Sequence, residues 1–187
     1  MKTLWMPAAT LAVLAMGCSD PAPTPAAVGL TLSIHSPNTP IPDSTCPILG
    51  TAQIGNPPPN GNPLNPGGRI TDGKSDVDVS CTVKGDGTFS VSGTIQQGAT
   101  RFNISGGRID ATTKMGTFNV SLHTPESRGL QSEAAAPCTF DASEPPLEVS
   151  KGNLFARFNC PALWRRDEAT PIACGGDGLV VLEFCQE

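Results

Sequence analysis

The chain has 187 residues, of which 38% are hydrophobic and 16% are charged, and its formal net charge is −5 at pH 7. Its 12 Lys and Arg residues, against 17 Asp and Glu, argue against a nucleic-acid partner, which would require clustered positive charge. The length is typical of one domain that is large enough to bury a hydrophobic core.

The first eighteen residues have the layout of an export signal. Lys2 precedes a mostly apolar run over residues 4–16, and Cys18 follows soon after. The run is too short to span a bilayer easily, but a positive residue, a short apolar segment and a small residue at the cut are the parts of a secretory signal peptide. We therefore expect export of the chain and removal of residues 1–17.

The stretch Ala15-Met16-Gly17-Cys18 resembles the lipobox of bacterial lipoproteins, with Ala15 where that family prefers Leu. In that family a diacylglyceryl group is attached to the cysteine thiol, and signal peptidase II cuts just before it. The resemblance implies that Cys18 is lipidated and holds the protein on a membrane of the cell envelope. Ser19 after the cysteine favours the outer membrane. The alternative is an ordinary secreted protein that is cut elsewhere.

Residues 18–27 form the expected tether between the lipid and the domain. Their Pro- and Ala-rich sequence lacks apolar periodicity and predicts an extended, semi-rigid spacer. Residues 28–187 are expected to form a single all-β domain.

Apolar residues alternate with polar ones along most of this domain, which predicts half-buried antiparallel strands. The expected strands cover residues 28–34, 75–83, 88–95, 101–105, 117–122, 153–160 and 178–184. The last of these is apolar on both faces, which is typical of a central strand. Seven or eight short strands with Gly-rich turns predict an antiparallel β-sandwich or a barrel-like domain.

Turn chemistry separates these strands. The Asp-Gly pair at residues 86–87 predicts a tight hairpin, and the Gly pair at 106–107 predicts a bulge. Residues 54–76 contain five prolines and several Asn-Gly contacts, so they are expected to form a long surface loop. Whether that loop is functional is left open.

Seven cysteines divide into one for the lipid and six for disulfides, because an even number in an exported chain indicates a disulfide set. Six cysteines allow 15 pairings. If the last two strands form a hairpin, the end of the first lies near the connection, which favours Cys160–Cys174. The simplest completion is then Cys46–Cys81 with Cys138–Cys185.

The sequence offers no convincing catalytic constellation, metal site or cofactor site. His35 and His123 stand at strand ends without an activated serine nearby, and Asp76 and Asp78 are expected to face solvent. A weak calcium site at these two aspartates is the minor alternative. The Gly-rich stretch 174–178 precedes a strand rather than a helix, so it is interpreted as a turn.

Residues 161–173 have the composition of an interaction loop. Trp164, Arg165 and Arg166 are of types that are enriched at binding hot spots, although the favoured interpretation is that Trp164 caps the end of the sandwich while the two charges are solvated. The sequence thus favours a non-enzymatic structural or binding lipoprotein of the cell envelope, with an envelope protein or polysaccharide as partner. The alternatives are a hydrolase of envelope polymers, and an inhibitor or accessory subunit of an envelope complex.

Overall fold

Alternating sequences produce strands throughout the part of the chain that the structure, a computed structural model, describes: residues 22–55, 68–74, 76–167 and 169–187. Eight strands there have five or more residues: β1 (Ala27–His35), β2 (Gly50–Ile54), β4 (Val77–Lys84), β5 (Thr88–Gln97), β6 (Thr100–Asp110), β7 (Met115–His123), β11 (Asn153–Arg165) and β12 (Ile172–Glu183). Four are shorter: β3 (Ile70–Thr71), β8 (Leu130–Gln131), β9 (Cys138–Asp141) and β10 (Glu148–Ser150). The described residues contain no α-helix.

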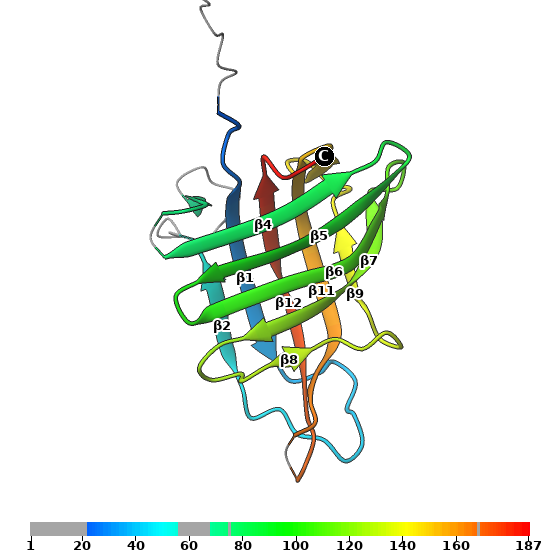
Figure 1. Cartoon of the computed structure of the whole chain (residues 1–187). Coiled ribbons are helices and arrows are strands. Elements are labelled where there is room, and N and C mark those ends of the chain that lie inside the picture. Colours follow the sequence, from blue (N-terminus) through cyan, green and yellow to red (C-terminus); the bar gives the residue numbers. More distant parts are fainter. Residues whose placement is uncertain (1–21, 56–67, 75, 168) are drawn as a thin grey trace, which may run out of the picture.

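One antiparallel sheet folds over on itself to make two layers. Its order is β2-β1-β12-β11, then β8 and β9 between β11 and β7, and then β7-β6-β5-β4. Strands β4 to β7 lie across the front of β1, β12 and β11 and run at a steep angle to them (Figure 1). The predicted fold class, an antiparallel and disulfide-bonded β domain, is confirmed.

The core lies between the two layers and is formed by the apolar residues that alternate with polar ones in the sequence. In β1 and β4 the apolar residues of one phase are buried, whereas most of the polar residues of the other phase are not. At the bend that joins the layers, the rings of Phe118 and Phe140 stack with their centroids 3.6 Å apart, and Phe158 meets Phe118 edge-on at 6.0 Å. Such aromatic contacts stabilise the junction beyond the area that they bury.

Strand β12 is covered on both faces, as its apolar sequence predicts. Val180 and Leu182 point into the core, and Val181 on the opposite face is also fully buried. On that outer face Phe155 lies opposite Val181, and the Arg69 guanidinium sits 5.0 Å above the Phe155 ring. Arg69 also pairs with Glu183 at 2.9 Å, so a charged side chain from outside the sheet completes the cover.

The Gly-rich stretch 174–178 is part of β12, so its interpretation as a turn is wrong. A Cβ on Gly178 would lie 1.8 Å from the carbonyl oxygen of Thr31 on the neighbouring strand. The glycines therefore serve the close approach of β1 and β12 rather than a reversal of the chain.

The predicted hairpin and bulge are both present. Strands β4 and β5 are joined at residues 85–87, and the register of β6 against β7 shifts between Ser105 and Arg108, with Gly106 at a φ of 62°. The predicted loop 54–76 contains the short strand β3, which pairs with β1; residues 56–67 and 75 lie outside the described residues. So do the signal peptide, Cys18 and the first part of the tether, up to residue 21.

The three expected disulfide pairings, Cys160–Cys174, Cys46–Cys81 and Cys138–Cys185, are wrong. The structure links Cys46 with Cys174, Cys81 with Cys185, and Cys138 with Cys160.

The main error concerns the length of the last hairpin. The prediction ended a strand at Cys160, but β11 continues to Arg165 and β12 begins at Ile172, so that Cys174 lies inside a strand opposite Leu163. On its other side β11 pairs with β9, where Asn159 faces Thr139. This register brings the Cα atoms of Cys138 and Cys160 to 4.1 Å.

The other two pairings follow from segments that return to the sheet. After β1 the chain comes back to β12, where Thr45 donates to the carbonyl of Pro171 and accepts from the amide of Ala173, which places Cys46 beside Cys174. After β12 the chain crosses to β4, where the Gln186 amide donates to the carbonyl of Cys81. Cys185 therefore meets Cys81, although 104 residues separate them.

Candidate binding surface opposite the tether

The N-terminal tether and the tip of the β11–β12 hairpin lie at opposite ends of the domain. The first described residues, from Ala22, lead into the upper end of β1, which runs the length of the domain (Figure 1). The tip of the β11–β12 hairpin projects from the lower end. We call this lower end the distal end, and define it by loop 36–49, turn 124–128 and the described residues 164–167 and 169–172 of the hairpin tip.

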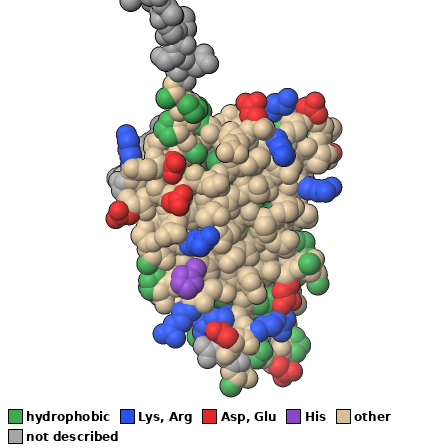
Figure 2. Space-filling view, in the orientation of Figure 1, with side chains coloured by type: hydrophobic (Ala, Val, Ile, Leu, Met, Phe, Trp, Pro, Cys, Tyr) green, Lys and Arg blue, Asp and Glu red, His purple; other side chains and the backbone are tan. Residues whose placement is uncertain are grey.

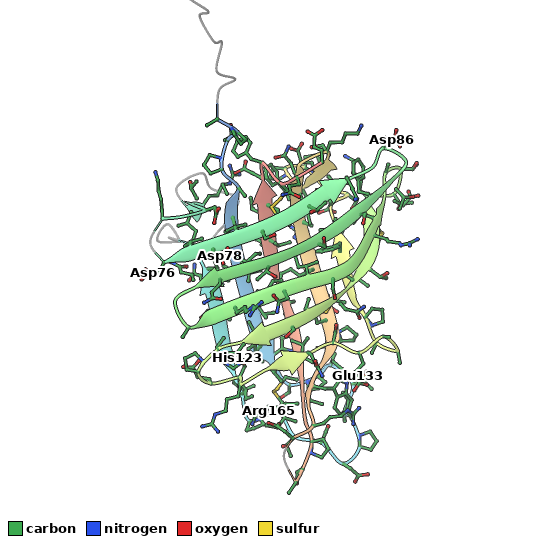
Figure 3. All side chains as sticks on the ribbon, viewed as in Figure 1. Asp76, Asp78, Asp86, His123, Glu133 and Arg165 are labelled. Atoms are coloured by element: carbon green, nitrogen blue, oxygen red, sulfur yellow. A yellow bond between two sulfur atoms is a disulfide. The ribbon has the colours of Figure 1, made fainter. Side chains whose placement is uncertain are left out.

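Side chains of several kinds gather at the distal end. Figure 3 places His123, Glu133 and Arg165 there, whereas Asp86 lies at the upper end. Figure 2 shows Lys and Arg side chains among acidic and hydrophobic ones at this end, below a front face that is mostly uncharged.

A disulfide holds the distal end together. The Cys46–Cys174 bridge joins loop 36–49 to the base of the hairpin tip, and the two backbone hydrogen bonds of Thr45 flank it. Because the loop is fixed at this point, a partner that binds here meets a surface with less conformational entropy to lose.

Trp164 and Arg166 form one unit with Glu133. The Arg166 guanidinium lies 4.1 Å from the centroid of the Trp164 ring, and its Nε donates to a Glu133 carboxylate oxygen at 2.7 Å. This hydrogen bond lowers the pKa of Glu133 and raises the pKa of Arg166. Both charged side chains remain accessible, with 55% of Arg166 and 36% of Glu133 exposed.

Arg165 points inward instead. Only 10% of its side chain is exposed; its Nη1 donates to the carbonyl of Ser127 at 2.8 Å, and its Nε lies 3.3 Å from Asp167. In turn 124–128 the hydroxyls of Thr124 and Ser127 each accept the other residue's backbone amide at 2.9 Å. Arg165 therefore connects the hairpin to a turn that is already closed.

Sequence reasoning grouped Trp164, Arg165 and Arg166 as a partner-contact site inside a loop closed by Cys160–Cys174. The structure brings the three residues to the distal end, on a hairpin that no Cys160–Cys174 bridge closes. It separates the inward Arg165 from the half-buried Trp164 and the exposed Arg166. Their contact with a partner stays a prediction.

Sequence reasoning missed a groove at the distal end. It has a volume of about 470 Å³ and is lined by Ile34, Ile48, Leu49 and Ala52 on one side and by Thr100 and Glu126 on the other. It runs along β2, whose five-residue sequence GTAQI has too little alternation to be recognised as a strand. No sequence signal marked the groove, since the 66% exposure of Leu49 appears only in the structure.

The other candidate residues lie apart from one another. The Nε2 of His35 contacts the Asp177 carboxylate at 2.9 Å, and His123 is exposed at the end of β7. Asp76 and Asp78 are exposed as expected, beside each other at the start of β4 (Figure 3). Within the described residues no three or more His, Cys, Asp or Glu side chains gather as a metal site would require. The described part of the chain also has no helix of the length and apolarity needed to cross a bilayer.

No family model, curated protein or solved structure matches this chain.

Proposed function

We propose that this chain is a lipid-anchored, non-enzymatic binding module of a bacterial cell envelope, and that it presents its distal end to a protein or polysaccharide partner. The observation that carries the proposal is the placement of the half-buried Trp164, the exposed Arg166 and the β2 groove at the end opposite the tether. A surface in this position faces away from the membrane to which Cys18 would attach the protein.

Two further features support the proposal. The lipobox-like sequence ends at Cys18 and is followed by a Pro-rich spacer. The other six cysteines all take part in disulfides, which persist in oxidising, extracytoplasmic compartments. A domain that is held at one end, with its loops fixed by a disulfide at the other, suits display of a binding surface.

The anchor is tested on the full chain expressed in a Gram-negative bacterium. Mass spectrometry should find a diacylglyceryl group on the Cys18 thiol and a new N-terminus at that residue. The Cys18→Ala variant should leave the membrane fraction. Wild-type protein that keeps its first methionine, or that carries an unmodified Cys18, would contradict the proposal.

The binding role is tested by capture of the anchored protein from detergent-solubilised membranes. Arg166→Glu reverses one exposed charge at the distal end, and Asp86→Lys is the matched reversal at the opposite end. Co-purifying molecules should be lost with Arg166→Glu and kept with Asp86→Lys. Equal recovery with both variants would argue against the distal end as the binding surface.

A further inference from the structure

Strands β2 and β4 lie at the two ends of the main strand order, and the outer edge of β4 is sealed. Along the outer edge of β4, Val77 donates to the carbonyl of Lys74 and accepts from the amide of Gly73, and the Val79 amide donates to the Asp72 carboxylate at 2.9 Å. Further along, the carbonyl of Cys81 and both backbone groups of Val83 are bonded to the C-terminal segment and to Gly152. Natural sheets cover edges in this way because open edges pair with other chains.

The edge of β2 is open by comparison. Strands β2 and β3 pair with the same side of β1. On that side the backbone amide of Asp72 donates to the carbonyl of Ala26. Because backbone groups alternate in direction along a strand, the even-numbered residues of β1 also point their amides and carbonyls toward β2. Ala52 and Ile54 lie opposite these residues, so their backbone amides and carbonyls pair with β1. The amides and carbonyls of Thr51 and Gln53 therefore point away from the sheet.

Among the described residues, nothing pairs with these four groups. The next outward amide, that of Gly55, is bonded to the Gln97 side chain at 2.8 Å, which marks where the open edge ends. Thr51 is exposed and Gln53 is half-buried, so both are accessible. Two outward residues spaced about 6.6 Å apart match the repeat of an added strand.

The groove described above runs along this open edge. Ile34, Ile48 and Leu49 make its apolar side, and the groove volume of about 470 Å³ lies within the range of ligand pockets. Glu126 is the one charged residue that lines it, and its carboxylate forms no ion pair within the described residues. The site therefore offers strand-spaced hydrogen bonds, a mostly polar recess with one apolar side, and one unpaired negative charge.

We propose that an extended segment of a partner protein adds to β2 as a further strand, with an apolar side chain in the groove and a Lys or Arg beside Glu126. The proposal rests on the proposed function and identifies the kind of partner that the distal end takes. Backbone pairing at an exposed sheet edge supplies the affinity in this mode of recognition, and the pockets beside it supply the specificity.

Two observations favour this occupant over others. Outward amides and carbonyls at strand spacing are complementary to a peptide backbone, which a polysaccharide does not have. A second copy that paired through β2 would bring its own acidic Glu126 to the interface, whereas the groove calls for a cation.

The probe is a phage-displayed library of random ten-residue peptides, panned on the full-length protein in detergent micelles. Selected peptides should alternate apolar and polar residues and include a Lys or Arg. A synthetic peptide of selected sequence should slow the hydrogen exchange of the Thr51 and Gln53 amides.

The decisive variant is Gln53→Pro, which removes one outward amide but no bond to β1, a position in which edge strands tolerate proline. It should weaken peptide binding roughly tenfold or more, as expected for the loss of a backbone hydrogen bond together with the steric effect of the ring. Gln53→Ala removes the same side chain but keeps the amide, so it is the matched control, and the loss of affinity is measured between these two variants. Glu126→Lys should weaken binding severalfold, with a smaller effect at high salt.

Several results would overturn the proposal: no enriched sequence, equal binding by Gln53→Pro and Gln53→Ala, or unchanged exchange at Thr51 and Gln53. Concentration-dependent dimers that Gln53→Pro abolishes would identify a second copy as the occupant. The capture experiment separates this inference from the proposed function. If Arg166→Glu abolishes capture of partners from membranes and Gln53→Pro does not, the inference is wrong and the proposed function stands.

Discussion

The Cys81–Cys185 disulfide should contribute more to stability than Cys138–Cys160, and the difference can be worked out from the loops that they close. The two bridges span 104 and 22 residues. With Cys46–Cys174 still closed, the shorter path between Cys81 and Cys185 runs through that bridge and is about 46 residues long. The chain-entropy model then gives about 4.0 and 3.4 kcal/mol of destabilisation of the unfolded state for the two bridges at 25 °C. The longer bridge also holds the C-terminal segment on the edge of β4.

The perturbation is a pair of double variants, Cys81→Ala/Cys185→Ala and Cys138→Ala/Cys160→Ala. All four cysteines are buried, so alanine introduces a comparable small cavity in each and no unpaired polar group. The Cys81→Ala/Cys185→Ala variant also releases the two hydrogen bonds between Gln186 and β4, each of which stabilises the fold by about 1 kcal/mol net. We therefore expect it to lose about 1–3 kcal/mol more than the variant that lacks the short bridge.

The assay is equilibrium urea unfolding of the oxidised proteins, with the free energy of unfolding obtained by linear extrapolation. Peptide mapping without reduction would first verify that the other two bridges remain as in the wild type. An equal loss in both variants, or a larger loss without the short bridge, would refute the reasoning that loop length and the sealed edge determine the order.

Three further outcomes are expected. Gly178→Ala should cost several kcal/mol in urea unfolding because the new Cβ would collide with the β1 backbone, whereas Gly87→Ala, with open space around the added atom, should be nearly neutral. Asp110 accepts hydrogen bonds from two backbone amides of the following turn, which lower its pKa below the ordinary value of 3.8. Its contribution to the stability of the fold is therefore complete above that value and is lost as the pH falls through the lowered pKa, so Asp110→Asn should flatten the acid limb of a stability–pH curve. Arg165→Ala should cost about 1.5–3 kcal/mol by removing its bond to turn 124–128, and faster amide exchange in that turn would report the loss.

Much of the fold could be predicted because strand identity depends on neighbours along the chain. Alternation placed Val77, Val79 and Val83 on one buried face of β4, and the Asp-Gly pair placed the turn that follows. The Gly pair in β6 marked the bulge. These signals are local, and tertiary packing agrees with them.

The candidate site was predicted only in part for the same reason. Trp164 and Arg166 attracted attention by residue type, and they do lie together at the distal end. Their partner Glu133 and the inward course of Arg165 could not be foreseen, because both depend on how β11 lies beside β8 and turn 124–128. The groove along β2 had no sequence signal, because its residues come from separate parts of the chain.

By itself, the sequence determined the strand content, the inward faces, the main turns and the even set of six domain cysteines. Only the tertiary structure decided which cysteines meet, since Cys46, Cys81 and Cys138 find their partners through strands and segments that return from distant parts of the chain. It also decided which sheet edge is sealed and which is open. The physical reason is range: hydrophobic periodicity acts between residues two apart, whereas disulfide geometry and edge pairing depend on contacts across the folded sheet.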